Sequence, residues 1–224
     1  MQISAEEGYR LWAPTYDSAP NPLLALEERL LRGLLQGTEA GRVVDIGCGT
    51  ARWARYFRSQ GAAAFAIDLS PEMLEMAGRY PELSQRLMLG DASNLPLRDQ
   101  SMDLLVCSFA LGHMSNLAQV FAEWSRIAHT GATLAISDLH PDALTAGWTG
   151  TFRVDDTVYS IVNYRHSLEM VRATAESAGF LLVSQTQAHL SARERAVLER
   201  GGKGDKLEAL RRTPALWIGV WEKP

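Results

Sequence analysis

Carboxylates and glycines stand together at the ends of predicted strands in the first half of the chain. Asp45 stands inside a short apolar run that ends at Ile46, and Gly47 and Gly49 follow this run. Asp68 comes 21 residues after Gly47, and Asp91 follows a third apolar run. Glycines allow a backbone to approach a ligand closely, and carboxylates accept hydrogen bonds from ribose hydroxyls and amines. The spacing therefore favours a site for a nucleoside that carries positive charge.

A nicotinamide dinucleotide is the main competing ligand for this glycine turn. A dinucleotide motif needs a third glycine so that helix and strand pack closely around a pyrophosphate, but Arg52 occupies that position. Asp45 would also repel a pyrophosphate. A nucleoside joined to an amino acid, with positive charge on an amine and a sulfonium, would instead make use of the acid. An ordinary tight turn without a ligand stays open as a further alternative.

The elements that must position these residues alternate along residues 42–138. Strands are expected at 42–46, 62–69, 86–89, 102–109 and 132–138, with helices at 51–59 and 117–128. Because these strands lack polar alternation, we expect them to be buried on both faces, as in a parallel sheet. An amphipathic helix is expected at 23–35, and Ser70 with Pro71 is expected to begin another helix. Asp45, Asp68 and Asp91 would then lie together at the edge of the sheet that is formed by the carboxyl ends of the parallel strands.

The pattern changes after residue 138. Residues 151–162 predict a β-hairpin, 167–177 a helix, and 180–187 and 216–221 two further strands. A helical stretch broken at residues 201–204 lies between these two strands. No repeat or linker divides the chain, so we expect one domain over residues 1–224.

Four stretches of the chain resemble the successive motifs of class I S-adenosylmethionine-dependent methyltransferases, most closely the ubiquinone/menaquinone-biosynthesis type. They are residues 43–54, 66–76, 90–97 and 102–109, and the resemblance covers about Tyr9 to Asp138. It implies an α/β fold: a Rossmann-like, doubly wound sheet of seven mostly parallel strands, the last one antiparallel, with helices on both faces. Residues 1–37 would form an N-terminal helical cover, and residues 139–166 a small cap insertion over the acceptor site.

The resemblance also implies S-adenosyl-L-methionine as cofactor and S-adenosyl-L-homocysteine as product. Asp45 and the glycine turn would hold the methionine end, Asp68 the ribose, and Ser108 the sulfonium region. The segment Tyr9–Asp17 would cover the cofactor. Ala51 departs from the family pattern, which usually has glycine there. The residues expected at the cofactor are Tyr9, Tyr16, Asp45, Gly47, Cys48, Gly49, Asp68, Leu69, Met73, Asp91, Ala92 and Ser108.

Histidines after the fourth and fifth strands are the candidate bases. His113 and His140 lie where ligands bind in open α/β sheets, and a base helps when the acceptor is a hydroxyl, a protonated amine or an acidic carbon. Either one can also be a hydrogen-bonded loop histidine. Trp148, Tyr164 and His166 of the cap are expected at the substrate, and such aromatic side chains favour an apolar or aromatic acceptor of modest size.

Composition narrows the possible partners. The net charge is −4 with 22 Lys and Arg, so nothing favours attraction to nucleic acid. The fourth strand also lacks the proline-proline-aromatic sequence of amino-directed DNA enzymes. Two cysteines make neither a disulfide framework nor a zinc site, and no metal is expected, since Asp138, His140 and His166 match no ligand spacing. No stretch approaches the length of a membrane span, and we expect a cytoplasmic protein.

The favoured function is methyl transfer from S-adenosylmethionine to a small-molecule acceptor, at oxygen before nitrogen or carbon. Carbon or carboxyl methylation in quinone or cofactor biosynthesis is the alternative among enzymes. A non-catalytic S-adenosylmethionine-binding protein is the alternative from another class. A short-chain oxidoreductase would need a tyrosine followed four residues later by lysine, which no tyrosine here has. The sequence leaves the oligomeric state open.

Overall fold

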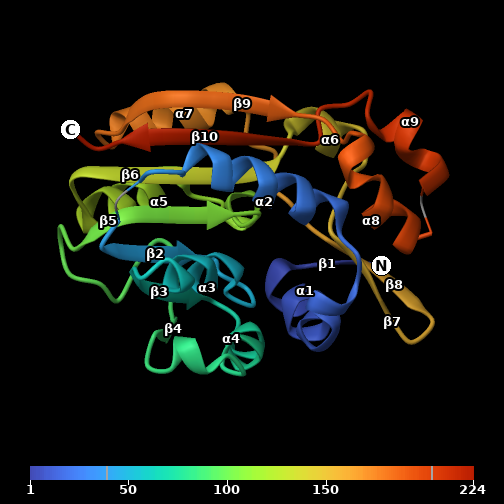
Figure 1. The fold of residues 1–224 in the computed structure, drawn as a ribbon, viewed down its shortest axis with the longest axis horizontal. Helices are drawn as coiled ribbons and strands as arrows, with labels where there is room; N and C mark the ends of the chain where they lie inside the picture. Colours follow the sequence, from blue (N-terminus) through green and yellow to red (C-terminus); the bar gives the residue numbers. More distant parts are fainter. Residues whose placement is uncertain (39, 203) are drawn as a thin grey trace.

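A seven-stranded sheet forms the centre of the molecule, in a computed structural model that describes residues 1–38, 40–202 and 204–224. The strand order is β4-β3-β2-β5-β6-β10-β9. All neighbours pair in parallel except β10, which runs antiparallel to both β6 and β9 and lies between them (Figure 1). The predicted mostly parallel sheet with an antiparallel last strand is therefore confirmed. The strands are β2 (Arg42–Ile46), β3 (Ala63–Asp68), β4 (Leu87–Leu89), β5 (Met102–Ser108), β6 (Ala128–Leu139), β9 (Leu181–Ala188) and β10 (Leu216–Glu222).

Helices cover both faces of this sheet because successive apolar residues of each strand point to opposite sides. Val43 belongs to the apolar cluster under α2, α3 and α8, whereas Val44 belongs to the cluster under α5 and α7. Trp53 of α3 and Trp124 of α5 are nearly or fully buried in these two clusters. These helices span α2 (Pro22–Leu34), α3 (Arg52–Ser59), α5 (Leu117–Ile127), α7 (Leu168–Ser177) and α8 (Arg195–Arg200).

Local capping explains where several helices begin. The Ser70 hydroxyl accepts a hydrogen bond from the Met73 amide at 3.2 Å, which starts α4 (Pro71–Ala77) as the sequence predicts. Asn21 caps α2 and Ser167 caps α7 in the same manner. The remaining helices are α6 (Pro141–Thr145), α9 (Leu207–Leu210) and the 3₁₀ helices η1 (Ala13–Ser18), η2 (Pro81–Leu83), η3 (Leu111–His113), η4 (Ala192–Glu194) and η5 (Gly204–Lys206). The predicted helical break at 201–204 begins at Gly201, where α8 ends, and includes Lys203, which lies outside the described residues.

The N-terminus and the predicted hairpin form a second, small sheet. The hairpin consists of β7 (Thr151–Val154) and β8 (Thr157–Ile161), and β1 (Gln2–Ile3) pairs in parallel with β8. Helix α1 (Ala5–Trp12) packs on this sheet, and Ile3, Phe152 and Ile161 form its own apolar cluster. We call residues 1–18 together with 151–161 the cover. It lies at the end of the main sheet toward which the parallel strands point (Figure 1).

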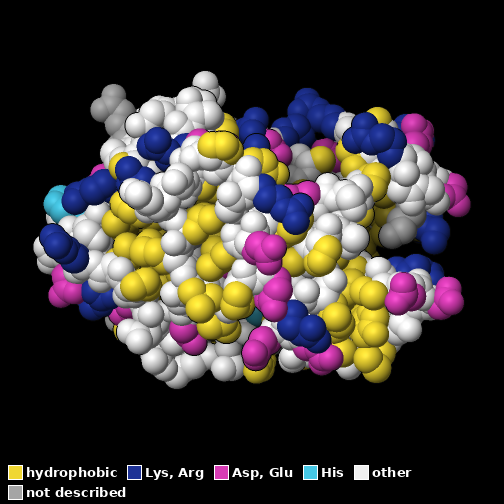
Figure 2. All heavy atoms as spheres, turned by 90° about the horizontal axis from the view of Figure 1, so that it is seen from below, with side chains coloured by type: hydrophobic (Ala, Val, Ile, Leu, Met, Phe, Trp, Pro, Cys, Tyr) yellow, Lys and Arg dark blue, Asp and Glu magenta, His cyan; other side chains and the backbone are white. Residues whose placement is uncertain are grey.

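Over the part of the chain that the structure describes, the face of the molecule shown in Figure 2 has no large patch of one charge. On the face shown in Figure 2, hydrophobic patches alternate with interspersed acidic and basic side chains. Among the described helices, none combines the length and the apolar character that crossing a membrane requires.

Candidate active site

Two adjoining cavities open at the carboxyl ends of the parallel strands. The first has a volume of about 380 Å³ and the second about 620 Å³. All the residues that the sequence assigns to the cofactor line the first cavity, and His113 lines both. The walls that the cavities share are formed by Tyr9, Tyr16, Leu24, Phe109 and His113. The two cavities therefore lie side by side and share one wall.

The glycine turn after β2 has the conformation that a close ligand approach requires. Gly47 has a φ of +65°, and a Cβ there would lie 2.5 Å from the Cβ of Ala110. Gly49 has a φ of +54° and nothing within 4 Å of such a Cβ, so it borders open space. Ala51 is also left-handed, with φ 62° and ψ 39°, a conformation that costs a residue other than glycine about 1–2 kcal/mol. The departure at Ala51 therefore changes the side chain and keeps the backbone shape.

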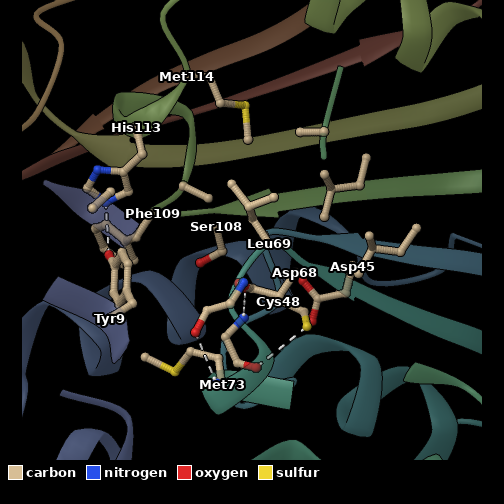
Figure 3. Close-up of a pocket in the computed structure, with 18 of the residues that line it drawn as sticks. Tyr9, Asp45, Cys48, Asp68, Leu69, Met73, Ser108, Phe109, His113 and Met114 are labelled. Atoms are coloured by element: carbon tan, nitrogen blue, oxygen red, sulfur yellow. Dashed lines mark hydrogen bonds between the residues drawn. The ribbon is translucent and has the colours of Figure 1, made fainter. Parts of the chain in front are cut away.

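Asp68 is held rigidly at the end of β3. Its Oδ2 accepts a hydrogen bond from the Gly49 amide at 2.7 Å, and its Oδ1 accepts one from the Ser70 amide at 2.8 Å. Burial raises the pKa of this carboxyl, and the backbone donors oppose that rise. Each oxygen retains a lone pair for a further donor. The side chain thus offers a fixed pair of acceptors to the first cavity (Figure 3).

The remaining residues predicted at the cofactor surround the same space. Met73 is buried, whereas Leu69 is 59% exposed at the cavity edge. Asp91 is exposed, and its Oδ1 accepts bonds from the amide and the hydroxyl of Ser93, both at 2.7 Å. The Ala92 carbonyl accepts a bond from the indole of Trp124 at 3.1 Å, which fixes this loop. The lining of the first cavity thus includes both apolar side chains and the Asp91 carboxylate.

Asp45 lies deeper than its position in the sequence suggests. Its side chain lines the first cavity but is only 2% exposed, and its Oδ2 accepts the Ala54 amide at 2.9 Å. Burial raises the pKa of Asp45 to about 7, although the Ala54 amide and the Arg52 charge act in the opposite direction. A positively charged group in the cavity would favour the ionised form.

Replacing Asp45 with asparagine should change the pH dependence of stability. A carboxyl whose pKa rises on folding makes folding less favourable as the pH increases from its ordinary pKa of 3.8 to its folded pKa of about 7. Between pH 5 and pH 8, the wild type should lose roughly 3 kcal/mol of unfolding free energy relative to Asp45→Asn. Urea unfolding of both proteins at these two pH values measures the difference. An equal pH response of the two proteins would contradict the predicted pKa.

A buried carboxylate that sequence reasoning missed organises the floor of the site. Glu27 of α2 is fully buried, and its Oε1 accepts bonds from Trp53 Nε1 at 3.1 Å, Ser108 Oγ at 2.9 Å and Ser137 Oγ at 2.8 Å. Its Oε2 accepts a bond from Arg52 Nη2 at 2.6 Å. One signal was present in the sequence, because Glu27 falls on the apolar face of a leucine-rich helix, where a carboxylate needs partners.

His113 and Tyr9 face one another where the cavities meet (Figure 3). The Tyr9 hydroxyl lies 2.9 Å from His113 Nε2, and His113 Nδ1 lies 3.2 Å from the Val162 carbonyl. Because a carbonyl only accepts, Nδ1 carries the proton and Nε2 accepts from Tyr9. Burial lowers the pKa of His113 and raises that of Tyr9 well above its ordinary value. Both groups are therefore neutral near pH 7, and both line the two cavities.

Asp138 is an acidic group of the second cavity that the sequence did not assign to catalysis. Its Oδ2 accepts the Gly112 amide at 2.7 Å, and its Oδ1 accepts the Leu139 amide at 2.7 Å. Burial raises the pKa of this carboxyl to about 6.

Phe109, which lines both cavities, has a φ of +54°. Backbone strain of this kind at a bulky residue tends to cluster at functional sites.

The other residues predicted on the acceptor side are only partly brought together. Trp148 lines the second cavity, whereas His140, Tyr164 and His166 line neither. His140 is buried as the cap of α6, where its Nδ1 accepts the Asp142 amide at 3.1 Å. His166 Nε2 bonds to the Met114 carbonyl at 2.9 Å. The predicted role of His140 as a base has no support in this geometry. Within the described residues, no group of three or more potential metal-ligating side chains is present.

Comparisons with known proteins agree with this geometry. Residues 44–136 match the family model described as a methyltransferase domain. The chain is 35% identical over 130 residues to the malonyl-[acyl-carrier protein] O-methyltransferase of Pectobacterium atrosepticum, covering 58% of this chain and 51% of that protein. It is 34% identical over 116 residues to the demethylmenaquinone methyltransferase of Tropheryma whipplei, covering 49% of this chain and 47% of that protein. The chain thus spans about half the length of the curated relatives it matches.

A solved structure shows the same fold over nearly the whole chain. The S-adenosylmethionine-dependent methyltransferase of Mesorhizobium loti superposes with a TM-score of 0.71 at 19% sequence identity, covering 90% of this chain and 100% of that one. The family match, the relatives and the strand order agree with the motifs found in the sequence. The chain therefore resembles class I, S-adenosylmethionine-dependent methyltransferases in its motifs, in the methyltransferase-domain match over residues 44–136 and in its fold.

Proposed function

We propose that the protein transfers the methyl group of S-adenosylmethionine to a neutral hydroxyl on a small apolar or aromatic molecule. The observation that carries this proposal is the pair of adjoining cavities, of about 380 and 620 Å³, that share the Tyr9–His113 pair as a wall. When bound, the cofactor supplies a carbon that its sulfonium activates toward in-line displacement. The protein then has to align two reactants, exclude water and accept a proton.

The residues of the first cavity fit this cofactor. Asp68 offers two fixed acceptors for ribose hydroxyls, and Leu69 and Met73 offer apolar surface for adenine. Gly49 borders open space beside the turn, and Asp45 offers a carboxyl to an ammonium group. Asp91 and Ala92 also line this cavity, and the Asp91 carboxylate offers an acceptor to an exocyclic amine.

The second cavity fits a neutral and mainly apolar acceptor. Trp12, Trp148 and Leu198 are among its apolar lining residues. Asp138 lies beside the His113 loop, and the exposed Lys206 is the one permanently cationic side chain among the described residues of this lining. If the methyl acceptor carried a carboxylate, that group would be repelled by Asp138, and no fixed cation would offset the repulsion. This favours a hydroxyl over the carboxyl alternative that the malonyl-[acyl-carrier protein] relative suggests.

The proton of such a hydroxyl has a defined route. Because His113 Nε2 already accepts from Tyr9, we propose that Tyr9 Oη takes the acceptor proton as its own proton passes to Nε2. The Val162 carbonyl at 3.2 Å from Nδ1 stabilises the resulting imidazolium. A free phenolate is never formed, which matters because burial makes one costly here.

A labelling experiment tests the proposed function. Purified protein, S-adenosylmethionine with a labelled methyl group and an extract of the source organism are incubated, and label is followed into small molecules, protein and nucleic acid. We expect label in an organic-soluble, base-stable small molecule. Label in a base-labile ester would indicate carboxyl methylation, and label in macromolecules alone would overturn the substrate class. Tight cofactor binding without any transfer would favour a non-catalytic binding protein.

Asp68 variants test the cofactor assignment without an acceptor. Asp68→Asn should raise the dissociation constant of S-adenosylhomocysteine roughly 10- to 100-fold, because hydrogen bonds to a charged acceptor are lost. Asp68→Ala should weaken binding more, since it also leaves the Gly49 and Ser70 amides without their acceptor, and Asp68→Glu should weaken it less. Asp99→Asn, at an exposed carboxylate paired with Arg126, is the control. Calorimetry that finds equal affinity for wild type and Asp68→Ala would refute the assignment.

A further inference from the structure

Arg52 carries a hydrogen-bond donor that the protein itself leaves unused. The guanidinium lies in the wall of the first cavity, and its Nη2 donates to Glu27 Oε2 at 2.6 Å and to Ser108 Oγ at 3.2 Å. Its Nη1 is buried and has no hydrogen-bond partner among the described residues. The carboxylate of Glu28 is 3.8 Å from Nη1, which is too long for a hydrogen bond. A buried unpaired donor is unfavourable and indicates a missing partner.

The guanidinium is held in place before any ligand arrives. Glu27 and Ser108 fix one edge, and the guanidinium carbon lies 4.9 Å from the centroid of the Trp53 ring. Glu27 is itself fixed by Trp53, Ser108 and Ser137. A ligand group that binds Nη1 therefore does not have to immobilise a flexible side chain.

The surroundings of Arg52 indicate the charge of the missing partner. The positive charge of Arg52 acts on Asp45 and on Tyr16, both of which line the same cavity, and lowers the pKa that burial otherwise raises in each. One region of the wall thus holds a cation and a carboxyl side by side. An amino acid in its zwitterionic form has the complementary pair of charges.

We propose that Arg52 binds the carboxylate at the amino-acid end of the cofactor through Nη1, while Asp45 faces its ammonium group. The inference rests on the proposed function, because it takes S-adenosylmethionine as the ligand of the first cavity. It gives Arg52 a positive role at a position where a dinucleotide motif would require glycine. Glu27 is then a positioning residue, since it holds the guanidinium without touching the ligand.

Two ligands that differ only in the carboxylate test this proposal by calorimetry. S-adenosyl-L-homocysteine carries the group, and its decarboxylated analogue S-adenosyl-3-thiopropylamine lacks it but keeps the amine. The wild type should bind S-adenosylhomocysteine roughly 10- to 100-fold more tightly than the analogue. Arg52→Gln should lose this preference while its affinity for the analogue changes little. Arg52→Lys, which keeps a charge without the planar fork, should recover part of the preference.

Controls separate this proposal from the cofactor assignment and from misfolding. Arg55→Gln, one turn away at an exposed pair with Glu82, should keep the full preference. If Arg52→Gln alone does not fold, the double variant Glu27→Gln with Arg52→Gln removes the buried unpaired carboxylate and allows the same titrations. A preference that persists without Arg52 overturns the proposal. Failure of the wild type to bind either ligand would instead overturn the cofactor assignment.

Discussion

Replacing Glu27 with alanine is expected to lower the unfolding free energy by about 3–5 kcal/mol, the range found when one partner of a buried ion pair is removed. Glu27 is fully buried and accepts from Arg52, Trp53, Ser108 and Ser137. The variant leaves the Arg52 charge partly buried without its partner and opens a cavity in the core. Urea unfolding of the wild type and the variant measures the loss.

Glu28 provides a matched control on the same helix. Its carboxylate pairs with Arg32 at the surface, so Glu28→Ala should cost less than about 1 kcal/mol. Glu27→Gln keeps the shape and part of the acceptor capacity, and should lie between wild type and Glu27→Ala. A loss for Glu27→Ala no larger than that for Glu28→Ala would show that the buried network contributes little to stability.

Replacing Tyr9 with phenylalanine is expected to lower kcat about 10²- to 10⁴-fold, the usual effect of removing a proton-transfer group. The ring stays in place, stacked on Trp12 at a centroid distance of 6.2 Å, so the affinity for S-adenosylhomocysteine should change only a few-fold. Turnover is measured with the acceptor that the labelling experiment identifies. In the wild type, kcat should rise with pH through the pKa of His113, which burial places below its ordinary value.

Two further variants make this test specific. His113→Gln removes the final proton acceptor, and combining it with Tyr9→Phe should add little, because both changes interrupt the same route. Tyr159→Phe, at a tyrosine of the cover that stacks on Phe152 and lines neither cavity, is the matched control and should leave most of the turnover. Unchanged turnover of Tyr9→Phe would contradict the route and favour an acceptor that needs no base.

The sequence predicted that the strand-end residues of the first cavity would lie together, because the strands they follow are parallel. Asp45, Asp68 and Asp91 lie near or after strand ends, and the carboxyl ends of such strands meet at one edge of the sheet. Their convergence on one cavity needs only the order of strands and helices. The hairpin at 151–162 could be predicted for a different reason. Its strand and turn residues are neighbours in the sequence, so a local pattern indicates it.

Long-range contacts explain what the sequence did not reveal. Tyr9 and His113 are 104 positions apart, and only the packing of the cover brings them together. The two-residue strand β1 carries no periodic signal. In the sequence, Arg52 was notable only as a replacement for the third glycine of a dinucleotide motif. Its hydrogen bond to Glu27 could not be predicted, because the two residues are 25 positions apart. His140 follows a strand as His113 does, but it caps a short helix and lines neither cavity.

The separate apolar cluster of the cover has a kinetic consequence. Ile3, Phe152 and Ile161 pack together apart from the two clusters that flank the main sheet. A part held by its own small cluster can open without unfolding the sheet, and its backbone amides then exchange hydrogen with solvent faster than those of β2 or β5. Because Tyr9 walls both cavities, one opening event would release both the spent cofactor and the methylated product. The rate at which the cover opens would then set an upper limit on the turnover number.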